Sequence, residues 1–230
     1  MTKTNRVAWR LAAILAAVVV NGSSAQARKL YPIDEGPRDA SFLAFRNRLL
    51  DAVKRHDLRF IHSILDPHVV TEFTGRNWGT VAAFRRRYEG KHASADLWKV
   101  LFTVLSLGGQ FLGTDQFRAP YVATAFPPDL QERDYEAIIG KNVRVRIGPS
   151  EAAWVIDILS YDLVKVDEEG SVPRNSNNPT WVKVTTPSGR QGYVAARYIR
   201  EFSDYQACFD KRRGRWWLSV LAAGDPNASD

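Results

Sequence analysis

Apolar residues in the first half of the chain recur three or four positions apart, which places them along one side of a helix. In the segment Ser41–His56, Phe42, Phe45, Leu49 and Val53 follow this spacing. Short acidic or hydroxyl side chains precede these segments and can accept hydrogen bonds from the first amides of a helix. We expect helices over Ser41–His56, Asp57–Leu65, Val81–Tyr88 and Ala95–Leu107, with N-caps at Asp39 or Ser41, at Asp57 and at Ser94.

Strand patterns accompany these helices. His68–Thr74 and Phe117–Phe126 have strand composition, while Asp204–Asp210 and Arg215–Leu221 alternate on either side of the turn Lys211–Gly214. An isolated hairpin is barely stable in water, so the terminal hairpin needs a partner sheet or helix. We therefore predict that residues 204–222 pair with the strand at 117–126 and complete the sheet of the first half.

The stretch Lys141–Arg200 has the pattern of a small all-β unit. Val143, Val145 and Ile147 alternate with charged residues, and Gly148-Pro149-Ser150 then breaks the strand. The later runs predict further strands and a hairpin: Trp154–Leu159, Leu163–Val166, Trp181–Val184 and Gln191–Val194. Short strands without a helical period are typical of a small barrel or sandwich.

This stretch resembles the bacterial SH3-like domain family. The resemblance rests, in order, on Val145–Ser150, Val155-Ile156, Trp181–Val184, Gly192–Val194 and Tyr198-Ile199. Two features depart from the family pattern: Arg144 stands where Asn is usual, and Asp167–Pro179 is longer and more polar. The resemblance implies a binding module of the bacterial envelope that recognises cell-wall peptide, peptidoglycan or an envelope protein, and not a catalyst.

The flanking segments are similar to the nuclear-transport-factor-2-like fold in their helix–helix–strand order and in the terminal hairpin Phe209–Leu218. That resemblance implies a curved antiparallel sheet that wraps a helix and leaves a pocket. The expected class is α+β, with an SH3-like barrel inserted into a domain of helices packed on an antiparallel sheet. The expected divisions are 1–27, then 28–133 together with 202–230, and 134–201 as the insert.

The first residues have the three parts of a secretory signal peptide. Lys3, Arg6 and Arg10 precede the apolar run Leu11–Val20, and Asn21–Ala27 then supplies small residues for cleavage after Ala27. A membrane anchor is the alternative, but this run is far shorter than the roughly 20 apolar residues that span a bilayer. We expect a periplasmic or secreted protein whose mature chain has no membrane span, with the formal charge lowered from +7 by three.

The sequence offers little catalytic chemistry. The histidines, His56, His62, His68 and His92, form no metal-binding motif, and the single cysteine, Cys208, follows all of them. We expect Cys208 to be a buried thiol rather than a nucleophile, and we expect no metal, no cofactor and no enzymatic activity. The alternative is a small-molecule enzyme or binder with a pocket in the first half, using His68, Asp66 or Asp115 as acid–base groups.

Basic and aromatic residues suggest the partner instead. Arg85–Arg87 and Lys211–Arg215 are basic clusters that either lie in solvent or dock anionic polymers, and we expect no nucleic-acid partner for a secreted chain. A barrel of this size cannot bury all of its aromatic residues, and exposed rings can stack on sugars or peptides. The predicted ligand-binding residues are Arg146, Tyr161, Trp181, Tyr193 and Tyr198, with Trp154 expected in the core.

Overall fold

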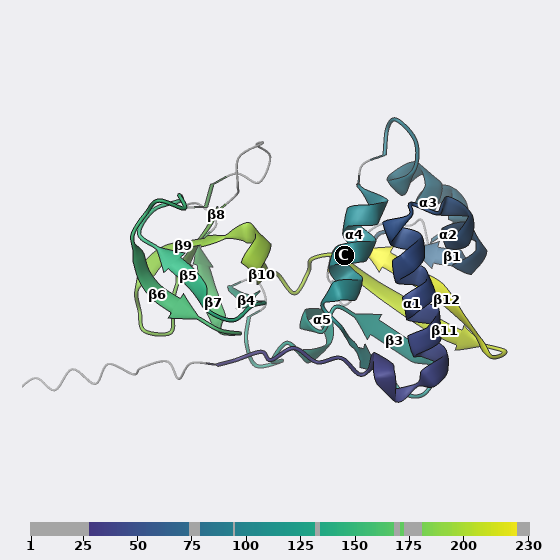
Figure 1. The fold of residues 1–230 in the computed structure, drawn as a ribbon, viewed down its shortest axis with the longest axis horizontal. Coiled ribbons are helices and arrows are strands. Elements are labelled where there is room, and N and C mark those ends of the chain that lie inside the picture. The colour runs from purple at the N-terminus through teal and green to yellow at the C-terminus, as the bar shows by residue number, and fades with distance from the viewer. Residues whose placement is uncertain are drawn as a thin grey trace, which may run out of the picture.

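The computed structural model describes residues 28–73, 79–93, 95–131, 134–167, 171–172 and 181–224. Within this part of the chain, strands form a five-stranded and a seven-stranded sheet, here called the first and the second sheet, and helices gather at the first (Figure 1). The predicted α+β class is confirmed. The expected signal peptide, Gly75–Trp78 of the predicted loop, the Ser94 cap and most of Asp167–Pro179 lie outside the described residues.

The helices are α1 (Ala40–Lys54), α2 (Leu58–Ile64), α3 (Val81–Tyr88), α4 (Leu97–Ser106) and α5 (Val122–Ala125), with short 3₁₀ segments η1 (Gly36–Arg38) and η2 (Ala196–Tyr198). Helices α1 and α2 begin at side-chain caps, as predicted. The Asp39 carboxylate accepts hydrogen bonds from the amides of Ser41 and Phe42, and the Asp57 carboxylate accepts one from the amide of Phe60. Helix α4 begins two residues later than predicted, because Asp96 accepts the amides of Trp98 and Lys99. Local capping therefore marks where α1, α2 and α4 begin.

The first sheet has the order β1-β12-β11-β3-β2. Its strands are β1 (Leu65–Val70), β2 (Gln110–Phe111), β3 (Gln116–Ala119), β11 (Gln206–Arg212) and β12 (Arg215–Ala222). The predicted pairing of the terminal hairpin is confirmed, because β11 pairs antiparallel with β3 and brings Phe209 opposite Phe117. The hairpin thus supplies the two central strands, although it lies nearly a hundred residues further along the chain.

Three details of this sheet differ from the prediction. Strand β3 ends at Ala119, and the rest of the predicted strand 117–126 contains a cis Ala119–Pro120 bond and helix α5. Strand β1 begins earlier than the expected His68 and pairs parallel with β12, so the sheet is not wholly antiparallel. Pro67 fits there because β1 is an edge strand, where a missing amide hydrogen costs no ladder bond.

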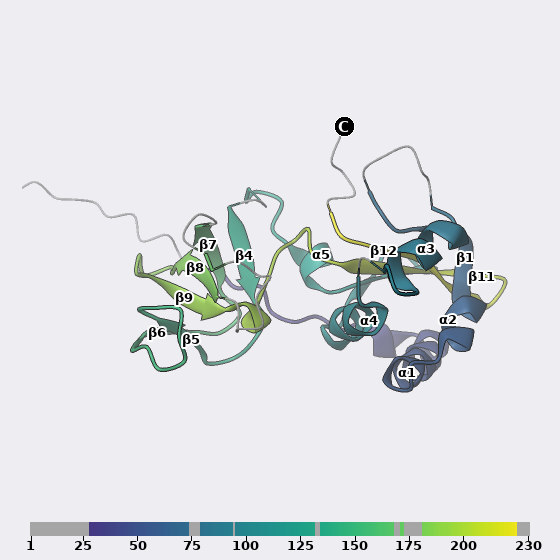
Figure 2. The same cartoon turned by 90° about the horizontal axis from the view of Figure 1, so that it is seen from above.

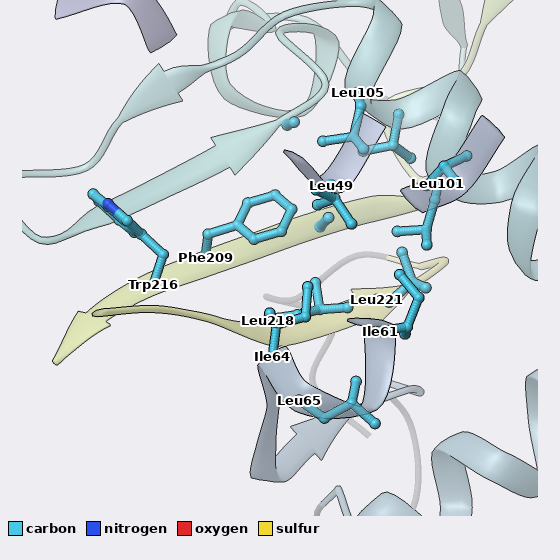
Figure 3. Packing of buried hydrophobic residues seen from close by; sticks show 14 of the residues in the cluster. Leu49, Ile61, Ile64, Leu65, Leu101, Leu105, Phe209, Trp216, Leu218 and Leu221 are labelled. Carbon is cyan, nitrogen blue, oxygen red and sulfur yellow. The ribbon is translucent and has the colours of Figure 1, made fainter. Parts of the chain in front are cut away.

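An aromatic and aliphatic core joins the helices to the first sheet. Figure 2 shows α1 and α4 on the same side of the β11–β12 ribbon, and Figure 3 shows Leu49, Leu101 and Ile61 directed toward these strands. Phe42 of α1 is fully buried, and its ring centroid lies 4.1 Å from that of Phe117 and 4.9 Å from that of Trp216. This packing fills the space between α1 and the sheet with rings.

The second sheet has the order β10-β4-β7-β8-β9-β5-β6. Its strands are β4 (Tyr135–Ile138), β5 (Val143–Arg146), β6 (Val155–Leu159), β7 (Leu163–Asp167), β8 (Trp181–Thr185), β9 (Gln191–Ala195) and β10 (Ile199–Arg200). Strands β4 and β10 were not predicted. The sheet encloses a core rich in valine, to which Val143, Val145 and Val182 contribute, so these strands share one buried face.

Two predictions for this sheet are wrong. A closed barrel was predicted, but the sheet is open, because among the described residues no ladder joins its edge strands β6 and β10. Side chains of the β8–β9 turn bond to β6: the Ser188 hydroxyl donates to the Asp157 carboxylate, and the Arg190 guanidinium donates to the Ile156 carbonyl. Ile147 does not extend β5, which ends at Arg146, and the Ile147 side chain is 66% exposed.

A smaller apolar cluster holds the two sheets together. It combines Leu30 of the N-terminal segment, residues of the two connections between the sheets (Tyr121, Val122, Phe126 and Phe202), and Ala137 and Leu163 of the second sheet. Lys29 adds an ion pair of 2.8 Å to the buried Asp162. The second sheet therefore has packed contacts with the rest of the protein in addition to its covalent links.

Replacing Phe42 by alanine should lower the free energy of unfolding by about 3–5 kcal/mol, because it opens a cavity among rings that cannot collapse into the space. Phe102→Ala on α4 is the matched control, since Phe102 is 51% exposed, and should cost about 1 kcal/mol or less. Urea unfolding followed by circular dichroism measures both. Similar losses for the two variants would contradict the central place of Phe42.

Asp39 should make the stability of the protein depend on acid pH. Hydrogen bonds from the Ser41 hydroxyl, and then from the Phe42 amide and Lys211, hold the pKa of Asp39 well below its usual value. A lowered folded-state pKa contributes stability that is complete above the unfolded pKa of about 3.9 and is lost as the pH falls toward the folded value.

Asp39→Asn is the matched variant, because asparagine also caps helices but does not titrate. We expect wild type to lose stability relative to Asp39→Asn as the pH falls from about 4 to about 2. Urea midpoints measured across this range should converge, and two parallel curves would show that Asp39 does not carry the effect.

Candidate ligand-binding site

A cavity of about 270 Å³ lies against the second sheet and is the best candidate for a binding site. Strand β5 and the turn before it supply one wall, and β8, the end of β9 and η2 supply the other. Three of the predicted ligand-binding residues, Arg146, Trp181 and Tyr198, line it. The remaining lining residues are Lys141, Asn142, Val143, Arg144, Glu151, Ala195 and Arg197.

The lining is strongly basic. Lys141, Arg144, Arg146 and Arg197 face a single acidic residue, Glu151. Arg197 pairs with Glu151 at 2.9 Å, and this hydrogen bond lowers the pKa of the Glu151 carboxyl, which is therefore ionised at neutral pH. Lys141 and Arg144 have no ion pair among the residues that the structure describes. The cavity consequently carries an excess of positive charge that suits an anionic ligand.

Neighbouring groups fix the side chains that the ligand would meet. The Arg146 guanidinium donates to the Ala153 carbonyl at 2.6 Å, which holds it over the β5–β6 turn. Tyr198 is 41% exposed, and the Arg197 guanidinium lies 4.9 Å from the centre of its ring. Trp181 also lines the cavity but is buried. Tyr198 is thus the aromatic surface on which a ligand could stack.

The other predicted residues lie elsewhere. Tyr161 occupies the turn between β6 and β7 with a positive φ, and its ring lies 5.8 Å from that of Tyr31. Tyr193 sits in β9 opposite Lys183 and Arg146 and does not line the cavity. Trp154, expected in the core, is 83% exposed. That prediction is wrong because Trp154 precedes the first residue of β6, where no neighbouring strand covers it.

Sequence reasoning missed much of the basic lining. Lys141 and Arg144 lie more than fifty residues before Arg197 in the chain, and no local pattern connects them to it. The signal that was present is the Arg144 departure from the resemblance to bacterial SH3-like domains, because it adds a cation at a position that lines the cavity.

The acid–base candidates of the first half do not define a comparable site. Asp66 is buried, accepts the His68 amide at 2.7 Å and forms an ion pair with Arg212. The His68 side chain is 88% exposed. Neither of them, nor Asp115, lines any of the cavities described here. Within the described residues, no three histidine, cysteine or acidic side chains gather as a metal site would require.

Two larger cavities border the helices that cover the first sheet. One of about 720 Å³ separates α4 from η2 and β10, and its basic residues are matched by acidic ones: Lys99, Arg197 and Arg200 face Asp96, Glu201 and Asp204. The other, of about 450 Å³, contains Arg46, which Asp34 engages through two bonds of 2.6 and 3.0 Å, and Tyr121, whose pKa burial raises to about 12. Internal compensation of charge makes both weaker candidates for an ionic ligand.

A comparison with known proteins found no matching family model, no similar curated protein and no similar solved structure. The functional argument therefore rests on the geometry and charge of the sites themselves.

Cys208 should be inert in the folded protein. It is buried in β11, as predicted, and burial raises the pKa of its thiol above the usual value. Because the thiolate is the reactive form, we expect no measurable reaction of the native protein with a disulfide reagent at neutral pH and one reacting thiol after denaturation. A thiol that titrates promptly in the native protein would disprove this.

Proposed function

We propose that the protein is an envelope-located binding protein whose second sheet recognises anionic cell-wall peptide at the basic cavity. The observation that carries the proposal is the excess of arginine and lysine around Tyr198 and Trp181 in one concave site. Cell-wall peptides carry free carboxylates, and guanidinium groups form the strongest hydrogen bonds to carboxylates. A cavity of about 270 Å³ is at the lower end of ligand sites and suits a short peptide segment.

The sequence supports the proposed location. The basic, apolar and small-residue parts of 1–27 are typical of a secretory signal, which would bring the mature chain beside the cell wall. Within the described residues, no helix is both long and apolar enough to cross a bilayer. The resemblance of Val145–Ser150 and Gly192–Val194 to bacterial SH3-like domains supports the same role, since these domains bind cell-wall components.

The alternative, an enzyme or binder of small molecules in the first half, has less support. The rings around Phe42 fill the space between α1 and the first sheet, and in the cavity of about 450 Å³ beside α1 the cation Arg46 is already paired with Asp34. The absence of enzymatic activity stays a prediction. A partner protein with an acidic extended segment would use the same carboxylate chemistry at the basic cavity. The binding experiment must therefore distinguish a protein partner from the cell wall.

Arg144→Ala and Tyr198→Ala should each weaken binding to purified peptidoglycan, and the double variant should lose about tenfold or more. Each exposed contact contributes about 1 kcal/mol or less, which corresponds to a factor of up to about five. Arg144 is suited to the test because it forms no ion pair among the described residues, so its removal leaves the fold intact. Co-sedimentation at increasing salt measures the effect, which added salt should reduce.

Arg48→Ala on α1 is the control, because it removes the same charge from an exposed position outside the cavity. It should bind as wild type does. If wild type does not bind peptidoglycan, the wall proposal is wrong, and cross-linking in the periplasm would then look for the protein partner. If wild type binds and the cavity variants bind equally well, the cavity is not the site.

A further inference from the structure

The tip of the β5–β6 hairpin exposes an unusual amount of apolar surface. Ile147 is 66% exposed, Trp154 is 83% exposed, and Val155 and Ile158 are 43% and 58% exposed. The Ile147 amide donates to the Trp154 carbonyl at 3.0 Å, so these two residues face each other where the strands diverge into the turn. These four large apolar side chains of one hairpin, with Ile147, Trp154 and Val155 at the turn and Ile158 further along β6, are here called the apolar tip.

Basic residues border the apolar tip. In the register of the hairpin, Ile158 lies opposite Arg144 and Val155 lies opposite Arg146, so these two exposed residues of β6 each have an arginine beside them on β5. Lys141, at the other end of β5, is exposed. Apolar residues surrounded by cations complement a surface that has apolar depth and a negative exterior, as an anionic bilayer does.

The geometry is less suited to an added peptide strand. Strand β6 is the edge of the second sheet, but two of its backbone groups already have side-chain partners. The Ile158 amide donates to the Asp157 carboxylate at 2.8 Å, and the Ile156 carbonyl accepts from the Arg190 guanidinium. A strand that paired at this edge would have to displace both, and such side-chain cover is how edges are protected from pairing.

Most of the apolar tip lies on the outer surface of the second sheet and not in a cavity. Ile147, Trp154 and Val155 line none of the cavities described above, whereas Ile158 lines a further one of about 360 Å³ beside Lys29 and Asp157. Figure 1 shows β6 on the side of the second sheet that faces away from the first sheet, so a flat partner can approach it without meeting the helices. Tryptophan in particular favours the boundary between lipid headgroups and acyl chains, where its ring is both apolar and a hydrogen-bond donor.

We propose that the apolar tip docks on an anionic lipid surface, with Trp154 and Ile147 entering the headgroup region and with Arg144 and Lys141 contacting lipid phosphates. This inference goes beyond the proposed function, because the apolar tip is separate from the cavity and its apolar residues take no part in binding a peptide. Arg144 is the residue that the two sites share.

The test is sedimentation of the mature chain with extruded vesicles of phosphatidylethanolamine and phosphatidylglycerol, compared with vesicles of phosphatidylcholine alone. Wild type should sediment with the anionic vesicles and at least tenfold less with the neutral ones. The double variant Ile147→Ser/Trp154→Ser should lose at least tenfold in binding to anionic vesicles while its melting temperature and its binding to peptidoglycan stay unchanged.

Phe102→Ser is the matched control, since it removes a half-exposed aromatic ring from α4, far from the apolar tip in sequence and structure. It should sediment as wild type does. Absence of binding to anionic vesicles, equal binding by the double variant, or an equal loss in the control would each overturn the proposal. A wild type that is dimeric, with a monomeric double variant and no vesicle binding by either, would assign the apolar tip to self-association and likewise overturn it.

Discussion

The pairing of β11 with β3 is the contact on which the rest of the structure depends. It places Ala207 opposite Ala119 and Phe209 opposite Phe117, and so brings the last strands of the chain into the middle of a sheet begun by the first half. Strand β12 then continues the sheet to β1. Without this hairpin, the apolar sides of α1 and α4 would have only the short strands β1, β2 and β3 to pack on.

This pairing also determines how the second sheet is held. The chain leaves the first sheet at Ala119 and returns at Gln206, so the two ends of the intervening segment start from neighbouring strands. A segment closed in this way loses less freedom than its length suggests, because closure entropy grows only slowly with loop length. The cluster around Tyr121 and the ion pair of Lys29 with Asp162 then fix the second sheet against the first.

Strand β5 divides the functional surface into two parts. Its inward residues, Val143 and Val145, form the core of the second sheet, and its outward residues, Arg144 and Arg146, point to solvent. On one side these arginines meet Arg197 and Tyr198 in the basic cavity, and on the other they border the apolar residues of β6. A single alternating strand therefore supplies positive charge to both proposed binding surfaces, because residues two positions apart on a strand share a face.

The sequence by itself determined the local elements. Spacing located α1 to α4 within one or two residues at most ends, Asp39 and Asp57 were recognised as caps, and alternation located most strands of both sheets. It also anticipated the burial of Cys208 and the partner of the terminal hairpin. These features depend on neighbouring residues, or on the simple need of an apolar hairpin for a partner, so the sequence carries them directly.

Only the tertiary structure decided which residues meet across long distances. In the tertiary structure β1 is parallel to β12, β3 ends before a cis proline and the second sheet is open. Trp154 and Ile147 are exposed, although their hydrophobicity predicted that they would be buried. It also gathered Lys141, Arg144 and Arg197 into one cavity and left Tyr161 and Tyr193 outside it. The physical reason is that burial and convergence depend on what other strands cover, and a residue's own neighbours in the chain do not specify that.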